Sequence, residues 1–487
     1  MEHPVNIKEG EAVDIAKKRM INMTEGKVFS KVLLFVLPLM ATNLLQTLYN
    51  AADMVVVGLS HEPDAVGAVG VTGSFITLVV NVFMGFATGA NVIIASQLGA
   101  RDDKNASKTV HTSLLLSVIL GIVGGVIGFA VARPVLALMG AEGKLLDLAT
   151  LYTKIYFCGV PFLSITNYEI AIFRAKGDTK TPLFVLAGAG LLNVVLNMVF
   201  VFAFKLSVEG VALATAISNI ASGIVLLFIL SRDESPCRFS FKKLAINRRA
   251  LGGIVKIGLP AGIQGSLFSV SNMVVQSSIL QVNNSICPPG SAFQPVVKGN
   301  AAAQSLESFL YQATNAVYQA SITFTSQNAG AGKHKRIWRV MGSCYSLTFL
   351  IAAVFVSIMF IFKAPFLALY GVNDSVAGSL EHIAFEASTS RMNITFTTYF
   401  LLAFMEVGCG VVRGLGKSTA STMISFIGSC LLRMGWILTV FAAFPTLEII
   451  YVAYPISWGV TALAQFVYSA VMLKRAKRRS SLQETVS

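Results

Sequence analysis

The chain has 487 residues, of which 54% are hydrophobic and only 13% are charged, and its formal net charge is +14. A soluble domain carries about 25% charged residues, so this composition excludes an ordinary soluble enzyme. It also excludes a disordered chain, because 33 Phe and many aliphatic residues could not remain solvated. The six cysteines are scattered, with no CxxC pair and no His at metal-ligand spacing, so they predict neither a disulfide framework nor a zinc site.

Apolar segments long enough to cross a bilayer follow one another along the chain. A spanning helix needs about 20 mostly apolar residues, and we find about twelve such segments. The predicted fold is therefore an all-α polytopic membrane protein. The predicted spans cover residues 30–55, 66–95, 110–131, 147–173, 183–206, 209–231, 252–280, 301–326, 338–362, 380–411, 419–443 and 447–472.

The distribution of Lys and Arg predicts the orientation. If the N-terminus is cytoplasmic, the inside segments hold roughly thirty of the Lys and Arg residues and the outside segments about five, a strong positive-inside asymmetry. We therefore expect both termini to face the cytoplasm. The basic residues lie in short patches between apolar runs and form no single folded basic face, so we expect no nucleic-acid partner. The first 27 residues are polar and contain no apolar core typical of a cleavable signal peptide.

The two halves of the chain repeat each other. The segment LLFVLPLMATNLLQTLYNAADMVVVG corresponds to IVKIGLPAGIQGSLFSVSNMVVQ, and SQLGARDDKNASKTV to SQNAGAGKHKRIWRV. RPVLALMG likewise matches APFLALYG, which places Gly140 opposite Gly371, and FRAKGDTKTP matches VRGLGKSTAS, which places Arg174 opposite Arg413. The sequence therefore predicts a tandem duplication of six helices.

An even number of helices per copy means that both copies enter the membrane from the same side, related by a pseudo-twofold axis along the membrane normal. We expect two lobes. The predicted parts are a cytoplasmic N-terminal tail (1–27), an N-lobe (28–231), a cytoplasmic linker (232–250), a C-lobe (251–473) and a cytoplasmic C-terminal tail (474–487). An outside loop at 282–299 contains three prolines, which resist helix formation, and could be either a surface insertion or a lid.

Several of these segments resemble one transporter family. The opening MTEGKVFSKVLLFVLPLMATNLLQTLYNAADMVVVG, the segments ASQLGA and TSQNAGAGK, and FRAKGDTKTP look like the bacterial multidrug and toxic compound extrusion (MATE) transporters. The resemblance covers nearly all of the chain. It implies secondary antiport in the bacterial plasma membrane, in which a Na⁺ or H⁺ gradient drives export of amphipathic, often cationic, small molecules. It implies no ATP and no cofactor besides the coupling ion, and we expect a monomer in the lipid bilayer.

Asp53 is the first candidate for ion coupling. It ends a series formed by Asn43, Gln46, Asn50 and Asp53, whose steps of three, four and three residues place them on one helical face. A polar stripe facing lipid would be costly, so we expect this face to point into the lobe interior. In the family, an acidic residue at the end of YNAAD is the first-helix coupling carboxylate, and Asp53 matches it.

Amides on later helices could complete the Asp53 site. Burial favours the protonated form of a carboxylate, which suits proton uptake, whereas a carboxylate with amide oxygens could bind a transported Na⁺. The candidate partners are Asn193, Asn197 and Asn219. Some relatives carry an acidic residue at the position of Asn197, so its amide here leaves the choice of ion open. A purely structural role for these residues is the alternative.

The second half offers Glu307 and Glu406. Glu307 lies among Gln304, Tyr311 and Asn315 at three- or four-residue spacing, so we expect it to point inward. Some relatives carry a seventh-helix Glu after the GLP turn, which this chain lacks. Either acid could be a second coupling group or a partner for a cationic substrate, together with Gln46, Asn50 and Tyr311. A buried, structurally paired carboxylate is the alternative for each.

Other charged residues are expected to have structural rather than transport roles. Glu169 is expected at the membrane interface, and Lys154 and Arg391 are expected to be snorkelling anchors rather than substrate ligands. GLGKST is not a phosphate-binding loop, because the required Gly five residues before Gly416 is Val411.

Two other functions are alternatives to drug export. The first is a flippase for lipid-linked sugars of the same superfamily, which would use basic groups to hold pyrophosphate, whereas the inward candidates here are mostly acidic. The second is a membrane-embedded enzyme. The chain is not expected to be an enzyme, because five scattered His residues provide no nucleophile–base or metal constellation.

Overall fold

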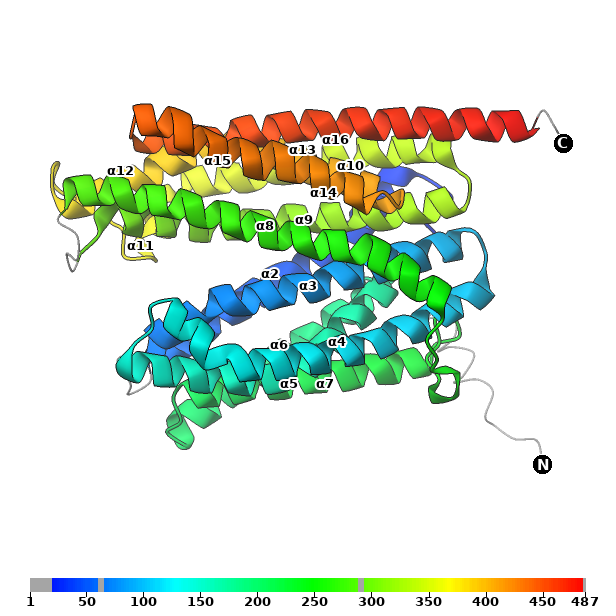
Figure 1. Cartoon of the computed structure of the whole chain (residues 1–487), viewed down its shortest axis with the longest axis horizontal. Helices are drawn as coiled ribbons and strands as arrows, with labels where there is room; N and C mark the ends of the chain where they lie inside the picture. The colour runs from blue at the N-terminus through cyan, green and yellow to red at the C-terminus, as the bar shows by residue number, and fades with distance from the viewer. Residues whose placement is uncertain (1–19, 60–64, 288–292, 485–487) are drawn as a thin grey trace. The chain divides into compact units, whose positions relative to one another are not determined.

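The computed structural model describes residues 20–59, 65–287 and 293–484, and all regular secondary structure in these ranges is helical (Figure 1). The expected all-α membrane architecture is confirmed. The α-helices are α2 (Val28–Gly58), α3 (Ala65–Gly99), α4 (Asp103–Leu138), α5 (Gly143–Lys176), α6 (Lys180–Met198), α7 (Val208–Ser231), α8 (Arg248–Ile286), α9 (Pro295–Gly330), α10 (His334–Ile361), α11 (Lys363–Ala368), α12 (Leu380–Arg391), α13 (Tyr399–Gly414), α14 (Ser418–Ser425), α15 (Leu432–Trp436) and α16 (Leu447–Glu484).

Short segments of other helical geometry continue several of these helices. A 3₁₀ turn, η2 (Phe241–Lys243), lies between α7 and α8. The π-helical segments are η1 (Val199–Ala203), η3 (Met392–Phe396), η4 (Phe426–Leu431) and η5 (Ile437–Phe441).

Among the described residues, ten helices are long and apolar enough to cross a membrane. The bent pair Leu380–Phe396 and Tyr399–Gly414, with an angle of 48° between its parts, makes an eleventh. Helix α9 has 36 residues but is not among them, because its sequence is rich in Asn, Gln and Ser. The predicted count of about twelve spans agrees with this set once the polar helix α9 is included.

The expected loop at 282–299 is shorter than predicted. Helix α8 continues to Ile286, and α9 begins at Pro295, where a proline fits because the first helical residue needs no N–H partner. The Asn283 side chain accepts a hydrogen bond from the Val296 N–H at 3.2 Å and so joins the two helix ends. Residues 288–292 of the expected lid or insertion lie outside the described residues.

The chain forms two compact units. The first contains α2 to α7, the part of α8 up to Gly262, and the segment Thr323–Arg336. In it, α5 packs against α3, α4 and α7 (Figure 1). The backbones of α4 and α5 approach closely, since a Cβ added at Gly121 would lie only 2.7 Å from the Cα of Pro161. Such close helix packing through small residues is typical of membrane bundles.

The second unit contains Ile263–Ile322 and the chain from Ile337 onward. Its central contact is between α13 and α16. Many buried side chains of this unit form an apolar core, in which Tyr399, Tyr451, Tyr454 and Trp458 are the largest members. Polar groups embedded in such a core must find partners inside the unit, because lipid offers none.

The sequence repeat is also a repeat of backbone geometry. Gly140 and Gly371 both end a helix with a positive φ, +90° and +68°. At the first turn, the Gly140 N–H donates to the Ala137 carbonyl and the Ala141 N–H to the Leu136 carbonyl, at 3.0 and 3.1 Å. At the second turn, equivalent bonds from residues 371 and 372 reach residues 368 and 367, at 2.9 and 3.1 Å. Both are Schellman-type caps, which require a residue that tolerates positive φ.

Residues 20–26 fasten two turns of the first unit to each other. The Ile21 N–H donates to the Gly177 carbonyl of the α5–α6 turn at 3.1 Å. The Asn328 Nδ2 and Arg336 Nε both donate to the Met23 carbonyl at 3.2 Å, and Arg336 Nη2 donates to the Glu25 carbonyl at 2.6 Å. The segment before α2 is therefore an ordered clasp between the α5–α6 turn and the α9–α10 turn.

Candidate functional site

Asp53 lies near the end of α2 and contacts α6 and α7. The Asn197 Nδ2 donates a hydrogen bond of 2.5 Å to the Asp53 Oδ1, and the Thr215 Oγ1 donates a longer one of 3.5 Å to Oδ2. The Asp53 side chain is half-buried. The carboxylate therefore joins three helices of the first unit through neutral partners.

The amides behind Asp53 continue the network. The Asn197 Nδ2 also donates to the Asn193 Oδ1 at 3.2 Å, and the Asn193 Nδ2 donates to the Thr215 Oγ1 at 3.3 Å. Asn193 and Asn197 are buried, one turn apart on α6. The Asn197 Oδ1 is a buried acceptor with no hydrogen-bond partner among the described residues. The cluster thus has unused acceptor capacity beside a carboxylate.

The structure brings together three of the four residues expected at this site. Asn219 is half-buried, and no hydrogen bond within the described ranges joins its side chain to the cluster. Thr215, one turn earlier on α7, takes that place. The sequence carried a weak signal for it, since Thr215 shares the helix face of Asn219.

The polar stripe of α2 does not point inward along its whole length. Gln46 and Asn50 are exposed on the first unit, whereas Asp53 is half-buried. The expectation that the stripe faces the lobe interior is therefore wrong for Gln46 and Asn50. Between them, the Tyr49 hydroxyl donates to the Ala187 carbonyl of α6 at 3.1 Å, which turns this part of α2 so that a tyrosine packs against α6.

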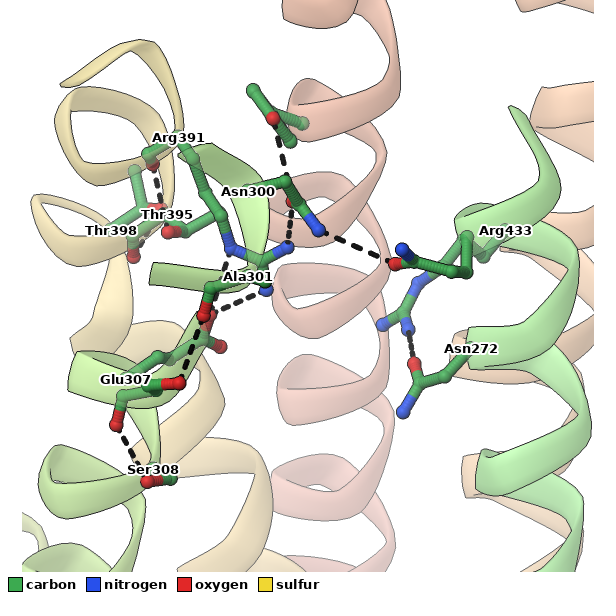
Figure 2. Close-up of polar contacts among 12 residues, drawn as sticks. Asn272, Asn300, Ala301, Glu307, Ser308, Arg391, Thr395, Thr398 and Arg433 are labelled. Carbon is green, nitrogen blue, oxygen red and sulfur yellow. Dashed lines mark hydrogen bonds and ion pairs between the residues drawn. The ribbon is translucent and has the colours of Figure 1, made fainter. Parts of the chain in front are cut away.

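Glu307 on α9 forms an ion pair in the second unit (Figure 2). Arg391 at the end of α12 donates to the Glu307 Oε2 from Nη2 at 2.6 Å and from Nε at 3.2 Å. The Arg391 Nη1 donates to the Asn300 Oδ1 at 2.6 Å. Arg391 is only 3% exposed, so the expectation of a snorkelling anchor is wrong for this residue. Glu307 points inward, as expected, and its partner is the arginine.

A second buried arginine lies close to this pair. Arg433 on α15 donates to the Asn272 Oδ1 of α8 (Figure 2) and to the Ser457 Oγ of α16, both at 3.2 Å. Its guanidinium carbon lies 4.2 Å from the centre of the Tyr454 ring. Arg433 is not among the site residues predicted from the sequence. An arginine inside the predicted span 419–443 was the available signal, because charged residues in spans are costly.

Tyr311 and Glu406 take no part in the ion pair between Glu307 and Arg391. Tyr311 is 38% exposed and accepts a hydrogen bond from the Asn315 Nδ2 at 3.3 Å. Glu406 is half-buried on α13, and the described residues provide it with no hydrogen bond. The nearby Arg413 instead donates to the Tyr318 hydroxyl and, at 2.8 Å, to the Gln264 Oε1.

Glu169 on α5 faces the interior of the first unit. It is fully buried, and neither carboxylate oxygen has a hydrogen-bond partner among the residues described. The five-residue distance to Arg174 predicts the depth of Glu169 along the helix, but it does not predict which side of α5 faces the core, so the burial of Glu169 was not expected from the sequence.

The single negative charge and the neutral oxygens of the Asp53 cluster suit one monovalent cation or one proton. In the part of the chain that the structure describes, no group of three or more His, Cys, Asp or Glu side chains comes together. Asp53 supplies the single negative charge, and the other members supply neutral oxygens. Such a site can be neutralised by one positive charge without stranding an opposite charge nearby.

Comparisons with known proteins agree with this architecture. Residues 38–199 and 294–439, one segment from each half, match the MatE family model. The chain is 26% identical over 474 residues to "Probable multidrug resistance protein YoeA" of Bacillus subtilis, covering 95% of this chain and 98% of the relative. It is 23% identical over 406 residues to "Multidrug export protein MepA" of Staphylococcus aureus, covering 83% and 85%.

Solved structures share the fold. One is an outward-facing conformation of a multidrug resistance MATE family transporter of the MOP superfamily, with a TM-score of 0.84 at 20% identity over 94% of this chain and 99% of that one. Another is a MOP superfamily transporter from Pyrococcus furiosus described by a reverse polarity of its binding pocket, with a TM-score of 0.85 at 20% identity and the same coverage.

Proposed function

Because the chain belongs to the MatE family of multidrug-efflux transporters, we propose that it is an antiporter that exports amphipathic small molecules in exchange for H⁺ or Na⁺ bound at Asp53. The protein works in the bacterial plasma membrane with both termini in the cytoplasm, as its positive-inside asymmetry predicts. It acts as a monomer and uses no ATP. An ion gradient is sufficient, because a membrane potential of about 100 mV supplies about 2.3 kcal/mol per charge moved inward.

The arrangement of Asp53 carries this proposal. Its carboxylate is bonded only to an amide and a hydroxyl, and a buried amide oxygen of Asn197 beside it has no partner in the described residues. A carboxylate held by neutral donors retains its negative charge for an incoming cation. An arginine partner would instead compete with that cation.

Neutralising Asp53 would change how α2 is held. An ionised carboxylate is a stronger acceptor than a protonated one, so its bonds to Asn197 on α6 and Thr215 on α7 weaken when a cation or proton binds. Helix α2 also contains Pro38, which removes one backbone hydrogen bond and makes the helix easier to bend. Ion binding at Asp53 thereby couples to the shape of the first unit and to release of the exported molecule.

The test uses purified protein in vesicles loaded with a fluorescent amphipathic cation, with the Na⁺ and pH gradients imposed separately. The wild type should export the dye under one of the two gradients, which identifies the ion. Asp53→Asn should reduce gradient-driven export at least tenfold while the protein remains folded. Asp147→Asn is the matched control, because Asp147 is exposed and paired with Arg133. Wild-type export by Asp53→Asn would overturn the assignment.

A further inference from the structure

The buried charges around Glu307 do not balance. Arg391 and Arg433 are 3% and 2% exposed, and both lie in the second unit near a single carboxylate, Glu307. Two positive charges and one negative charge leave one buried positive charge. Glu448 on α16 is exposed and accepts a hydrogen bond from the Ser390 hydroxyl at 3.5 Å. Ion pairs of this cluster, within the described residues, are confined to Arg391 and Glu307.

Each of the three guanidinium nitrogens of Arg391 has a hydrogen-bond partner. Its Nε and Nη2 both reach Glu307, and its Nη1 reaches Asn300 (Figure 2). The Tyr451 hydroxyl donates to the same Asn300 oxygen at 3.4 Å. A guanidinium bound to a carboxylate through two nitrogens is well compensated even in a nonpolar environment. The excess charge therefore belongs to Arg433.

Arg433 has only neutral partners. Its two amino groups donate to Asn272 and Ser457, and the face of its guanidinium lies over Tyr454. Its Nε is buried and has no acceptor in the described chain. A guanidinium offers five N–H donors, so this one has unused donors as well as an uncompensated charge. Burying an ion without a counter-ion costs several kcal/mol, and charged residues at such positions in membrane proteins mark binding sites or ion paths.

Side chains of α8 connect Arg433 to the surface of the second unit. Asn272, which accepts the hydrogen bond from Arg433 Nη1, is exposed, and so is Gln276 one turn further along the helix. The Gln276 Oε1 accepts a hydrogen bond from the Asn300 Nδ2 at 3.3 Å, and Asn300 in turn accepts one from Arg391. Gln276 therefore links the surface to the ion pair of Arg391 and Glu307. Rotation of one exposed side chain, Asn272, would free a donor of Arg433 toward the surface.

We propose that Arg433, approached past Asn272, binds a negatively charged group of the exported molecule. The substrates of this site would be amphipathic molecules that carry a carboxylate, sulfonate or phosphate, including zwitterions. This inference rests on the proposed export function and names the substrate class. It adds an anionic group to the amphipathic, often cationic substrates that the family resemblance implies.

The binding test compares two probes that differ at one group. Rhodamine 110 carries a free carboxylate, and rhodamine 123 is its methyl ester with the same cationic ring system. Equilibrium binding is measured by fluorescence anisotropy, with the purified protein in nanodiscs of phosphatidylcholine. The wild type should bind rhodamine 110 at least tenfold more tightly than rhodamine 123. Arg433→Gln should abolish this preference and leave rhodamine 123 binding unchanged. Arg133→Gln, a substitution of an exposed arginine, is the control and should retain the preference.

A second variant covers the case in which Arg433→Gln does not fold. Asn272→Asp places a carboxylate where Arg433 already donates a hydrogen bond, so the counter-ion becomes part of the protein. This variant should lose the preference for rhodamine 110 and unfold at a higher temperature than the wild type. Equal binding of the two probes by the wild type, or an unchanged preference in Asn272→Asp, would overturn the proposal.

Two further measurements distinguish a substrate site from a lipid site, and failure of the anion site from failure of the antiport proposal. Phosphatidic acid added to the nanodiscs should not displace rhodamine 110, and displacement that depends on Arg433 would assign the site to a lipid headgroup and overturn the substrate role. Binding requires no gradient, so Asp53→Asn should retain the preference for rhodamine 110. If neither gradient drives export while the preference persists, the antiport proposal fails and the anion site stands.

Discussion

At the scale of single residues, Asp53 and Glu307 show how partners decide what a buried carboxylate can do. Asp53 is bonded to an amide and a hydroxyl, so a cation can replace or join those bonds without leaving another charge behind. Glu307 is bonded to Arg391 through two guanidinium nitrogens. Neutralising Glu307 would strand a buried guanidinium, at a large cost. These partners favour ion coupling at Asp53 and a structural pair at Glu307.

Removing one member of the Glu307 pair should therefore be more harmful than removing both. We expect Glu307→Gln to lower stability by about 3–5 kcal/mol, because it leaves Arg391 buried without a counter-ion. The double variant Glu307→Gln with Arg391→Met should recover most of this loss, as judged by thermal unfolding in detergent. Glu448→Gln, at an exposed acid, should change little. A double variant as unstable as the sum of its two single variants would contradict the argument.

At the scale of elements, the segment between α7 and α8 is packed rather than loose. The Ser240 N–H donates to the His111 Nε2 at 3.1 Å, and the Asn247 N–H donates to the Thr112 Oγ1 at 3.0 Å, so the segment is bound to α4. Cys237 is buried in the core of the first unit, and burial raises the pKa of its thiol to about 12. The thiol therefore stays protonated and unreactive at neutral pH.

An ion pair holds the start of this segment. The Lys176 Nζ lies 2.7 Å from the Asp233 Oδ2, and the Ser235 hydroxyl donates to the same oxygen at 2.6 Å. Burial by itself would raise the pKa of Asp233, but the charge of Lys176 and the hydrogen bonds from Lys176 and Ser235 outweigh it, so the pKa lies below the usual 3.8. The pair therefore stabilises the folded state above pH 3.8, and this contribution is lost as the pH falls from there through the lowered pKa.

Asp233→Asn should loosen the segment at neutral pH. We expect amide hydrogen exchange in residues 232–245 to become about tenfold faster at pH 7, because losing a charge-assisted hydrogen bond costs about 1.5–3 kcal/mol. The difference between variant and wild type should persist down to about pH 5 and shrink as the pH falls below 3.8 through the lowered pKa of Asp233, because the wild-type carboxyl then becomes protonated too. A difference that grows with acidity would contradict this sign.

At the scale of the whole molecule, the duplication explains why distant turns are built alike. The turns at Gly140 and Gly371 have the same two cap hydrogen bonds, and Leu136 and Leu367, which accept one of them, are both fully buried. The turns at Gly177 and Gly416 form a second matched pair, each with a positive φ. The two copies thus share a backbone plan even though their buried charges differ.

Matched glycine substitutions can test this shared plan. Gly140→Ala and Gly371→Ala should each destabilise the protein by about 1–2 kcal/mol, because a Cβ strains the left-handed conformation. Neither new methyl group would meet an atom closer than 3.5 Å, so the cost belongs to the backbone. Gly188→Ala in the middle of α6, where a Cβ meets open space, should instead stabilise by up to about 1 kcal/mol. Unequal effects at the two turns, measured by thermal unfolding, would argue against equivalent caps.

Hydropathy, helical periodicity and the internal repeat can be followed along the chain itself, so the sequence alone predicts the spans and the duplication and singles out Asp53 as a candidate. Side-chain partners are not local. Thr215 is 162 residues from Asp53, and Arg391 is 84 residues from Glu307, so no spacing rule could join them. Only tertiary packing could decide which polar side chain lies next to which. That packing pairs Glu307 with Arg391 and leaves Arg433 without a counter-ion. A polar group buried in a membrane protein finds no partner in lipid, so the fold alone decides which side chains become its partners.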